Sequence, residues 1–413
     1  MKDRPAALGR RSVILVTGTW TATALGVVAT ILTARWLGPE AVGILGFGFG
    51  VAGIVGALLL PGLSQAHVKR VAEGQDVGRC VATMLGAQLA LQITQVVVLL
   101  VVVRWWSAVL PAGVVLGRRG VVLRASDRAI LRSYWAHARP LLWTSPVSLL
   151  QDSLDRVAVA HWAGLTAAGH YQVARALWEV LGTLNAYPFQ MLFARLSRLF
   201  ATRTAETETE ARRLFAAAVD HLLFLVTPAA LLLWALRDVV VSVLYGGAFL
   251  PAAAPLTALI AAALLQTALN PYHFVLYALD AHARFVPVVF ARFVLYLVAL
   301  ALLVPAADAV GAALVRLLVV IVPAWTFVRW ARELAGVRFP TVTWLYLAAF
   351  AAGAAASEAA RFALGPLGWP AVPIGAAVAA LATAGAIVGI GHPAPRANLA
   401  YAALVLRLPR RAE

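Results

Sequence analysis

Several charged side chains lie inside otherwise apolar segments, and their spacing is helical. Asp152 lies four residues after Ser148, Asp155 lies three residues after Asp152, and Arg156 comes directly after Asp155. A helix would therefore place these side chains along one stripe. Asp152 and Arg156 are spaced to form an ion pair one turn apart, which would leave Asp155 free. Two uses fit this stripe: a polar face that binds an ion or a phosphate, or a salt bridge that holds packed helices together.

The next apolar segments carry further charges. Arg175 and Glu179 lie one turn apart and allow the same two uses, whereas Arg292 and Arg316 each stand alone in a segment. An ionisable side chain inside a membrane helix is costly and usually faces protein or a water-filled cavity. The planar guanidinium group suits phosphate because it can donate two parallel hydrogen bonds. The candidate substrate-binding residues are therefore Arg156, Arg175, Arg292, Arg316, Asp152, Asp155 and Glu179.

Composition indicates the elements that must position these residues. Of 413 residues, 62% are hydrophobic and 13% are charged, whereas soluble domains average about 45–50% and about 25%. This composition is sufficient for about twelve transmembrane helices of about 20 residues each. It excludes a soluble enzyme, a disordered chain and a secreted disulfide scaffold, and the continuous apolar runs exclude an alternating β-barrel pattern. We expect an all-α, polytopic membrane protein.

The basic residues are distributed as in a membrane protein. The net charge is +16, and all basic residues except Lys2 and Lys69 are arginines. In a soluble protein such an excess would indicate nucleic-acid binding. Here the basic residues gather in short gaps between apolar runs, as the positive-inside rule describes. We expect a multi-pass protein of the cytoplasmic (plasma) membrane, with both termini cytoplasmic and no nucleic-acid partner.

No enzymatic signature is found in the sequence. The single Cys80 excludes an internal disulfide and a cysteine-based metal site. The histidines show no H-x-x-x-H spacing, and neither a Walker loop nor a Rossmann glycine motif is present. We therefore expect no catalytic residues, no cofactor and no metal.

The order of apolar and basic segments predicts the topology. Clear apolar segments are found at residues 12–34, 41–63, 81–103, 140–161, 169–193, 215–236, 252–276, 285–304, 309–328, 341–363 and 369–390. The positive-inside rule places the N-terminus and the basic segment 118–139 on the same side, which requires an even number of crossings between them. We therefore predict a further short or re-entrant span at 105–123, which brings the total to about twelve.

A weak internal repeat supports this count. Trp36–Gly43 and Trp162–Gly169 share the pattern W-x-G-x-x-A-x-G, and at the same offset Lys69 corresponds to Arg195. Four spans between the copies make the repeat parallel, whereas three would make it inverted. We expect two pseudo-repeated lobes, at 1–139 with about four spans and at 140–338 with about six, followed by two extra spans and a basic tail at 339–413.

The sequence around the repeat contains longer motifs, namely ARWLGPEAVGILGFGFGVAGIVG, LPGLSQAHVKRVAEG, SLDRVAVAHWAGLTAAGHYQVARAL and LYGGAFLPAAAPLTALIAAALLQ. These motifs resemble the polysaccharide biosynthesis, or oligosaccharide flippase, family of the multidrug/oligosaccharidyl-lipid/polysaccharide exporter superfamily. The resemblance implies a two-lobed flippase that moves polyprenyl-(pyro)phosphate-linked oligosaccharide across the membrane by alternating access. The first lobe departs from the family, because it has room for about four spans where the resemblance implies about six.

Two other functions remain open. A cation-coupled drug exporter of the same superfamily would need a lone carboxylate in its cavity, such as Asp155. A non-transporting scaffold subunit of a glycan assembly complex would need no substrate cavity. The expected partners are a lipid-linked oligosaccharide, membrane lipids, and glycosyltransferases or a polymerase of the same pathway.

Overall fold

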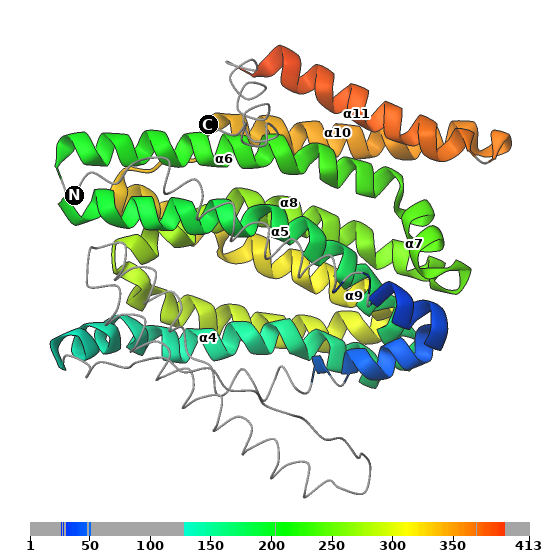
Figure 1. Ribbon diagram of the computed structural model, residues 1–413, viewed down its shortest axis with the longest axis horizontal. Helices are drawn as coiled ribbons and strands as arrows, with labels where there is room; N and C mark the ends of the chain where they lie inside the picture. Colours follow the sequence, from blue (N-terminus) through cyan, green and yellow to red (C-terminus); the bar gives the residue numbers. More distant parts are fainter. Residues whose placement is uncertain are drawn as a thin grey trace, which may run out of the picture.

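The computed structural model describes residues 26, 28, 30–47, 49–50, 128–202, 204–368 and 370–392 (Figure 1). Every secondary-structure element within these ranges is helical, in agreement with the all-α prediction. After the helical N-terminal residues 30–47 and 49–50, the elements are α4 (Arg128–Trp162), α5 (Leu165–Thr202), α6 (Ala205–Ala235), α7 (Arg237–Tyr245), η1 (Gly247–Ala252), α8 (Ala253–Ala278), η2 (Ala281–Arg284), α9 (Phe285–Ala335), α10 (Thr341–Leu364), η3 (Gly365–Leu367) and α11 (Ala371–Gly391).

Several of these helices have the length and apolarity of membrane spans. Within the described residues, 5 helical segments meet both conditions: α6, η1 with α8, α9, α10 and α11. α4 and α5, of 35 and 38 residues, are longer than the about 20 residues that a span needs, but they carry many polar and charged side chains. Large apolar side chains face outward, and Phe362 and Ile390 are 90% and 89% exposed. Such exposure suits contact with acyl chains, so the chain is a multi-pass membrane protein.

α9 is broken near its middle. Its backbone leaves the helical region at Ala307 and Asp308, and Asp308 has a φ of 49°. A Cβ on Gly311 would lie 2.0 Å from the carbonyl oxygen of Leu303, so the chain folds back sharply after the break. α9 therefore consists of two arms, and the break coincides with the predicted boundary between the segments 285–304 and 309–328.

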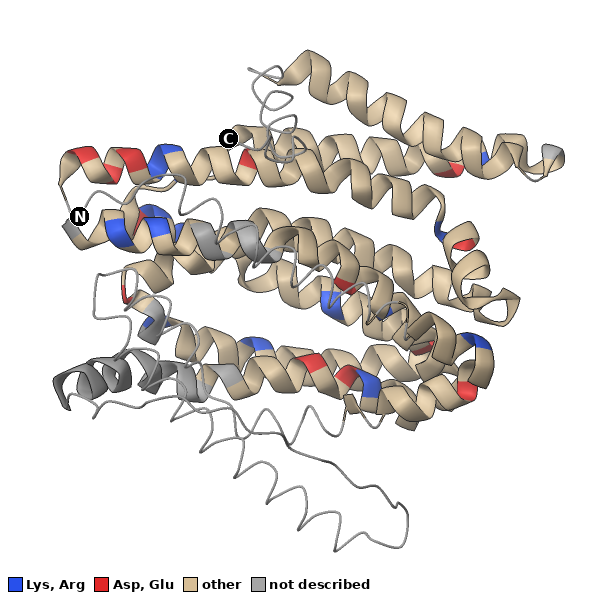
Figure 2. Cartoon of the chain, in the orientation of Figure 1, with Lys and Arg blue, Asp and Glu red and all other residues tan. Residues whose placement is uncertain are grey.

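α6 begins earlier than the apolar pattern predicts, at Ala205 rather than near Phe215. The backbone N–H of Thr207 donates to the side chain of Thr204, whose own N–H donates to the Thr207 hydroxyl. These reciprocal bonds form a capping box. Figure 2 shows charged residues gathered at this end of α6, and a second charged group part-way along α4 and α5.

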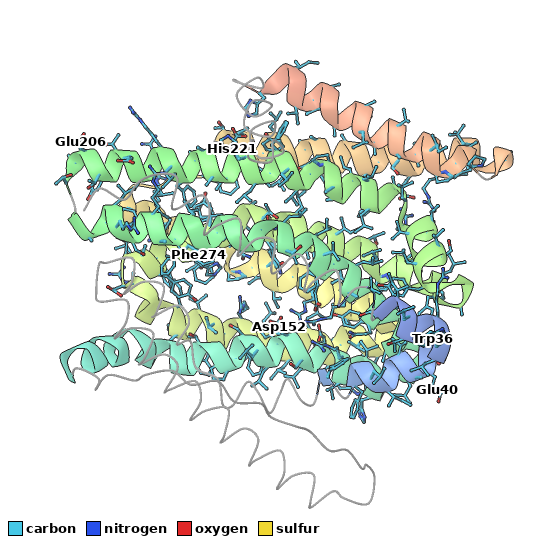
Figure 3. The ribbon with its side chains drawn as sticks, viewed as in Figure 1. Trp36, Glu40, Asp152, Glu206, His221 and Phe274 are labelled. Carbon is cyan, nitrogen blue, oxygen red and sulfur yellow. The ribbon has the colours of Figure 1, made fainter. Side chains whose placement is uncertain are left out.

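The two copies of the repeated motif have the same backbone conformation at their first glycine. Gly38 and Gly164 have φ angles of 77° and 88°, in the left-handed region that glycine adopts at little cost. Each glycine lies two residues after a tryptophan, and both tryptophans, Trp36 and Trp162, are exposed. Figure 3 places Trp36 and Glu40 at one end of the bundle and Glu206 at the opposite end. We call these the Trp36 end and the Glu206 end.

The second glycines of the two copies form reciprocal contacts. A Cβ on Gly43 would lie 1.9 Å from the carbonyl oxygen of Leu165, and a Cβ on Gly169 would lie 1.9 Å from that of Pro39. Gly43 thus packs on Leu165, which follows Gly164, and Gly169 packs on Pro39, which follows Gly38. The two copies of the motif therefore lie together at the Trp36 end, and the parallel two-lobed repeat stays a prediction. Arg35 adds a link to α7 by donating from Nε to the carbonyl oxygen of Leu244 at 2.9 Å.

Replacing Gly169 by alanine should destabilise this contact by about 1–3 kcal/mol, because the added methyl group would overlap the Pro39 carbonyl. The matched control is Gly182→Ala in the same helix, where a Cβ would have no neighbour within 4 Å among the described residues. The control should be neutral or stabilising by up to about 1 kcal/mol. Unfolding of both variants in mixed micelles measures the difference, and equal stabilities would contradict the close contact.

α10 and α11 pack on α6 through partly buried polar contacts. Near one end of α10, Tyr346 donates to Asp220 of α6 at 2.9 Å, and His392, just after α11, contacts the same carboxylate at 2.9 Å. Near the other end, Arg237 donates to Glu358 of α10 at 2.6 Å. The helix pair is therefore joined to α6 and α7 at two separate points.

The total number of spans stays a prediction. The segments 12–34 and 41–63 lie partly outside the described residues, and the segments 81–103 and 105–123 lie wholly outside them. The count of about twelve and the domain ranges 1–139, 140–338 and 339–413 therefore also stay predictions.

Candidate functional site

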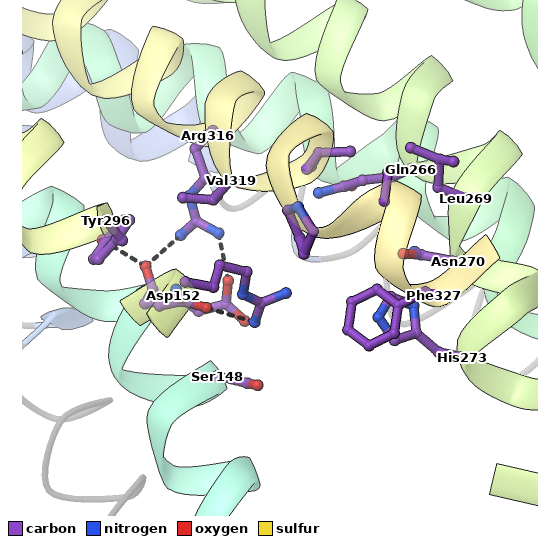
Figure 4. A pocket seen from close by; sticks show the side chains of 15 residues that line it. Ser148, Asp152, Gln266, Leu269, Asn270, His273, Tyr296, Arg316, Val319 and Phe327 are labelled. Atoms are coloured by element: carbon purple, nitrogen blue, oxygen red, sulfur yellow. Dashed lines mark hydrogen bonds and ion pairs between the residues drawn. The ribbon is translucent and has the colours of Figure 1, made fainter. Parts of the chain in front are cut away.

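A pocket of about 330 Å³ lies between α4, α8 and the two arms of α9 (Figure 4). Its volume is within the range of small-ligand sites. α4 and α9 supply the charged side chains, whereas α8 supplies amides and a histidine on another wall. The polar lining residues are Ser148, Gln151, Asp152, Gln266, Asn270, His273, Arg292, Tyr296 and Arg316.

Behind this pocket, Asp155 is completely buried and accepts hydrogen bonds from four groups. The donors are the Tyr171 hydroxyl at 2.6 Å, the Arg156 backbone N–H at 2.8 Å, Arg175 Nη1 at 3.1 Å and Arg316 Nε at 2.8 Å. The prediction that Asp155 remains free is therefore wrong. One carboxylate instead holds two buried guanidinium groups in fixed positions.

Arg316 is paired, which contradicts the prediction that it stands alone. Besides its bond to Asp155, its Nη2 donates to the backbone carbonyl of Gln151 at 2.8 Å, and its Nη1 donates to Asp152 Oδ1 at 2.5 Å. Its acidic partners come from α4, far away in the sequence, so the residues near Arg316 could not reveal them. Arg316 still lines the pocket, where Asp152 covers its Nη1 atom.

Arg175 lies in the same ionic cluster but is absent from the pocket lining. Its Nε donates to Glu179 at 2.8 Å, one turn along α5, and its Nη1 donates to Asp155. The indole ring of Trp178 lies 5.7 Å from the Arg175 guanidinium and 5.6 Å from that of Arg316. These distances allow cation–π attraction to both arginines. Arg175 and Glu179 thus hold the cluster together rather than face the pocket.

Arg156 does not form the predicted ion pair with Asp152. Its Nη2 donates to the backbone carbonyl of Asp152 at 3.2 Å, while the Asp152 carboxylate is bound by Arg316. The Cβ of Arg156 lies next to the N-terminal helix, 3.4 Å from the position of a Cβ built on Gly50. Arg156 is therefore not part of the pocket lining.

Arg292 is a pocket cation without an acidic partner among the described residues. Its Nη2 donates to Gln151 Oε1 at 2.6 Å, and its buried Nε has no hydrogen-bond partner there. No described carboxylate oxygen lies within ion-pair distance of Arg292, as its solitary position in the sequence predicts. Its guanidinium group therefore keeps hydrogen-bonding capacity for a ligand.

Part of this site lies within a stretch that resembles a known family, whereas α9 and nearly all of α8 lie beyond it. Residues 76–254 match the family model of polysaccharide biosynthesis proteins. This match confirms the predicted resemblance, and it includes α4 and α5, which carry Asp152, Asp155 and Arg175. No curated protein and no solved structure matches the chain. The family match and the apolar helices together support a transporter-type membrane protein with a role in polysaccharide biosynthesis.

Several pocket residues were not predicted from the sequence. Gln266, Asn270 and His273 follow one another at helical steps on α8 and reach one wall of the pocket. Their spacing within an apolar segment could have revealed this polar stripe. Gln151 was also missed, although it precedes Asp152, and its backbone carbonyl accepts from the Tyr296 hydroxyl at 2.7 Å.

Proposed function

We propose that this protein translocates a polyprenyl-(pyro)phosphate-linked oligosaccharide across the cytoplasmic membrane for surface polysaccharide biosynthesis. The observation that carries this proposal is Arg292, a cation on the pocket wall without an acidic partner among the described residues. A phosphate group beside it would receive charge-assisted hydrogen bonds. The amides of Gln266 and Asn270 on the α8 wall supply donors and acceptors that suit sugar hydroxyls.

The charge balance around the pocket favours an anionic substrate. Among the described residues, the pocket and the cluster behind it hold one arginine more than carboxylates: the arginines are Arg156, Arg175, Arg292 and Arg316, and the carboxylates are Asp152, Asp155 and Glu179. A drug exporter that binds cations would need an accessible carboxylate. Asp155 is fully buried and already accepts four hydrogen bonds, and Asp152, which lines the pocket, is already paired with Arg316, so neither carboxylate is free to bind a cation.

The contacts at the Trp36 end fit a transporter that works by alternating access. The reciprocal packing of Gly43 and Gly169 holds the two motif copies together at that end. Arg35 strengthens the closure by bonding to the carbonyl oxygens of Val243 and Leu244 near the end of α7. A substrate that leaves through the Trp36 end would require these contacts to separate.

Reconstitution of the purified chain in vesicles tests the proposal directly. The substrate would be a fluorescent, short-chain polyprenyl-pyrophosphate-linked sugar, and a membrane-impermeant quencher would report its leaflet. We expect the protein to make inner-leaflet substrate accessible to the quencher, whereas protein-free vesicles should keep it protected. A matched lipid without the phosphate groups should stay protected in both.

Absence of movement would overturn the flippase proposal. If the same protein also co-purified with a glycosyltransferase, the scaffold function would be favoured instead. Movement of cationic dyes without movement of the lipid-linked sugar would favour the drug exporter.

A further inference from the structure

Asp152 differs from Asp155 although both carboxylates bind Arg316. Asp155 is completely buried and accepts four hydrogen bonds, so it cannot leave without exposing several unsatisfied donors. The side chain of Asp152 is 51% exposed and lines the pocket. Within the described part of the chain, its carboxylate accepts from Arg316 Nη1 alone. Asp152 is thus the exchangeable partner of Arg316, and Asp155 is the fixed one.

The nitrogen that Asp152 covers is the part of Arg316 that remains available to the pocket. Arg316 Nε bonds to Asp155, and Nη2 bonds to the Gln151 carbonyl and lies 2.7 Å from Asp155. Only Nη1 faces a partner that is itself half exposed. An anion that binds Arg316 from the pocket would contact the Nη1 atom. At that position the negative charge of Asp152 would repel it.

We propose that Asp152 is an internal counter-ion of Arg316 that competes with the anionic substrate for the Nη1 atom. A phosphate oxygen displaces the carboxylate from Nη1, and Asp152 turns towards the open part of the pocket. The proposal rests on the phosphate-bearing substrate class of the proposed function. It gives Asp152 a role opposite to that of a substrate-binding residue, because its charge weakens binding and favours release.

Glu179 provides a matched control. Like Asp152, it is an acidic residue of this cluster that pairs with a buried arginine. Its Oε1 atom lies 2.8 Å from Arg175 Nε, and its side chain is 55% exposed. Unlike Asp152, it does not line the pocket. Glu179→Gln and Asp152→Asn therefore remove the same charge from the same cluster, but only the second removes the competitor at Arg316 Nη1.

The experiment measures binding of inorganic pyrophosphate to the full-length protein in detergent by isothermal titration calorimetry. Asp152→Asn should bind about tenfold more tightly than the unmodified protein, as expected when one like charge beside a partly buried anion is removed. Asp152→Ser should show the same gain, which guards against an effect specific to asparagine. Glu179→Gln should stay within about threefold of the unmodified protein, because its charge is farther from the ligand. Thermal unfolding would verify that each variant is folded.

Weaker or unchanged binding in both Asp152 variants would overturn the proposal, as would an equal gain in Glu179→Gln. Absence of pyrophosphate binding in all variants would overturn it together with the phosphate substrate class. If the unmodified protein binds pyrophosphate and Asp152→Asn does not bind it more tightly, only the counter-ion role fails. If Asp152→Asn binds more tightly but the vesicle assay shows no movement, only the flippase proposal fails.

Discussion

Replacing Asp155 by asparagine should lower the free energy of unfolding by about 3–5 kcal/mol, enough to prevent recovery of folded protein from a marginally stable chain. The substitution removes the one carboxylate that Arg175 and Arg316 share, and Asp155 is 0% exposed. Two buried guanidinium groups would then lose their shared, fully buried counter-ion and would keep only the half-exposed carboxylates of Glu179 and Asp152. Unfolding in mixed micelles, together with the yield of monodisperse protein, measures the effect.

Glu333→Gln is the control for this prediction. It removes the partner of Arg329 in an exposed pair one turn apart on α9, where the nitrogen and oxygen are 2.7 Å apart. Exposed pairs contribute about 0–1 kcal/mol, so this variant should remain close to the unmodified protein. A stable Asp155→Asn protein would show that the buried cluster does not depend on this carboxylate.

Replacing Arg292 by alanine should reduce transport of the lipid-linked sugar roughly 10- to 100-fold. Hydrogen bonds to charged groups contribute about 1.5–3 kcal/mol, which corresponds to this range. Arg292 has no acidic partner among the described residues, so its removal leaves no buried carboxylate unpaired. The variant should therefore fold normally, and the vesicle assay would measure its activity.

Arg329→Ala is the matched control, because Arg329 is an exposed arginine on the same helix and lies outside the pocket. It should transport at close to the unmodified rate. Arg292→Lys should recover only part of the activity, since an ammonium group keeps the charge but loses the planar fork. Full activity in Arg292→Ala would remove Arg292 from the substrate site.

The helices were predictable where apolarity alone defines them. The boundaries of α10 and α11 lie within two residues of the predicted segments 341–363 and 369–390. α6 was less predictable at its start, because its first turns are polar and are fixed by the hydrogen bonds between Thr204 and Thr207. Hydropathy marks the part of a helix that suits a membrane, whereas capping marks where the helix begins.

The candidate site was predictable only for contacts within one helix. The pair of Arg175 and Glu179 forms at the spacing that the sequence shows. The equally spaced pair of Asp152 and Arg156 does not form, because Arg316 from the second arm of α9 binds the Asp152 carboxylate instead. Helical spacing shows which side chains can meet along one helix, but it cannot show which neighbouring helix supplies a stronger partner.

The two attachment points between α10–α11 and the helices α6 and α7 determine which surfaces can slide during transport. Sliding of α10 along α6 would break the contacts of Asp220 and of Glu358 together, at a cost of about 1.5–3 kcal/mol for each hydrogen bond to a charged group. These contacts therefore favour movement of α10 and α11 together with α6 and α7. The annular lipid that touches α11 consequently meets the exposed side chains of Ile374, Val378 and Ile390, because the alanine row of this helix is turned towards protein.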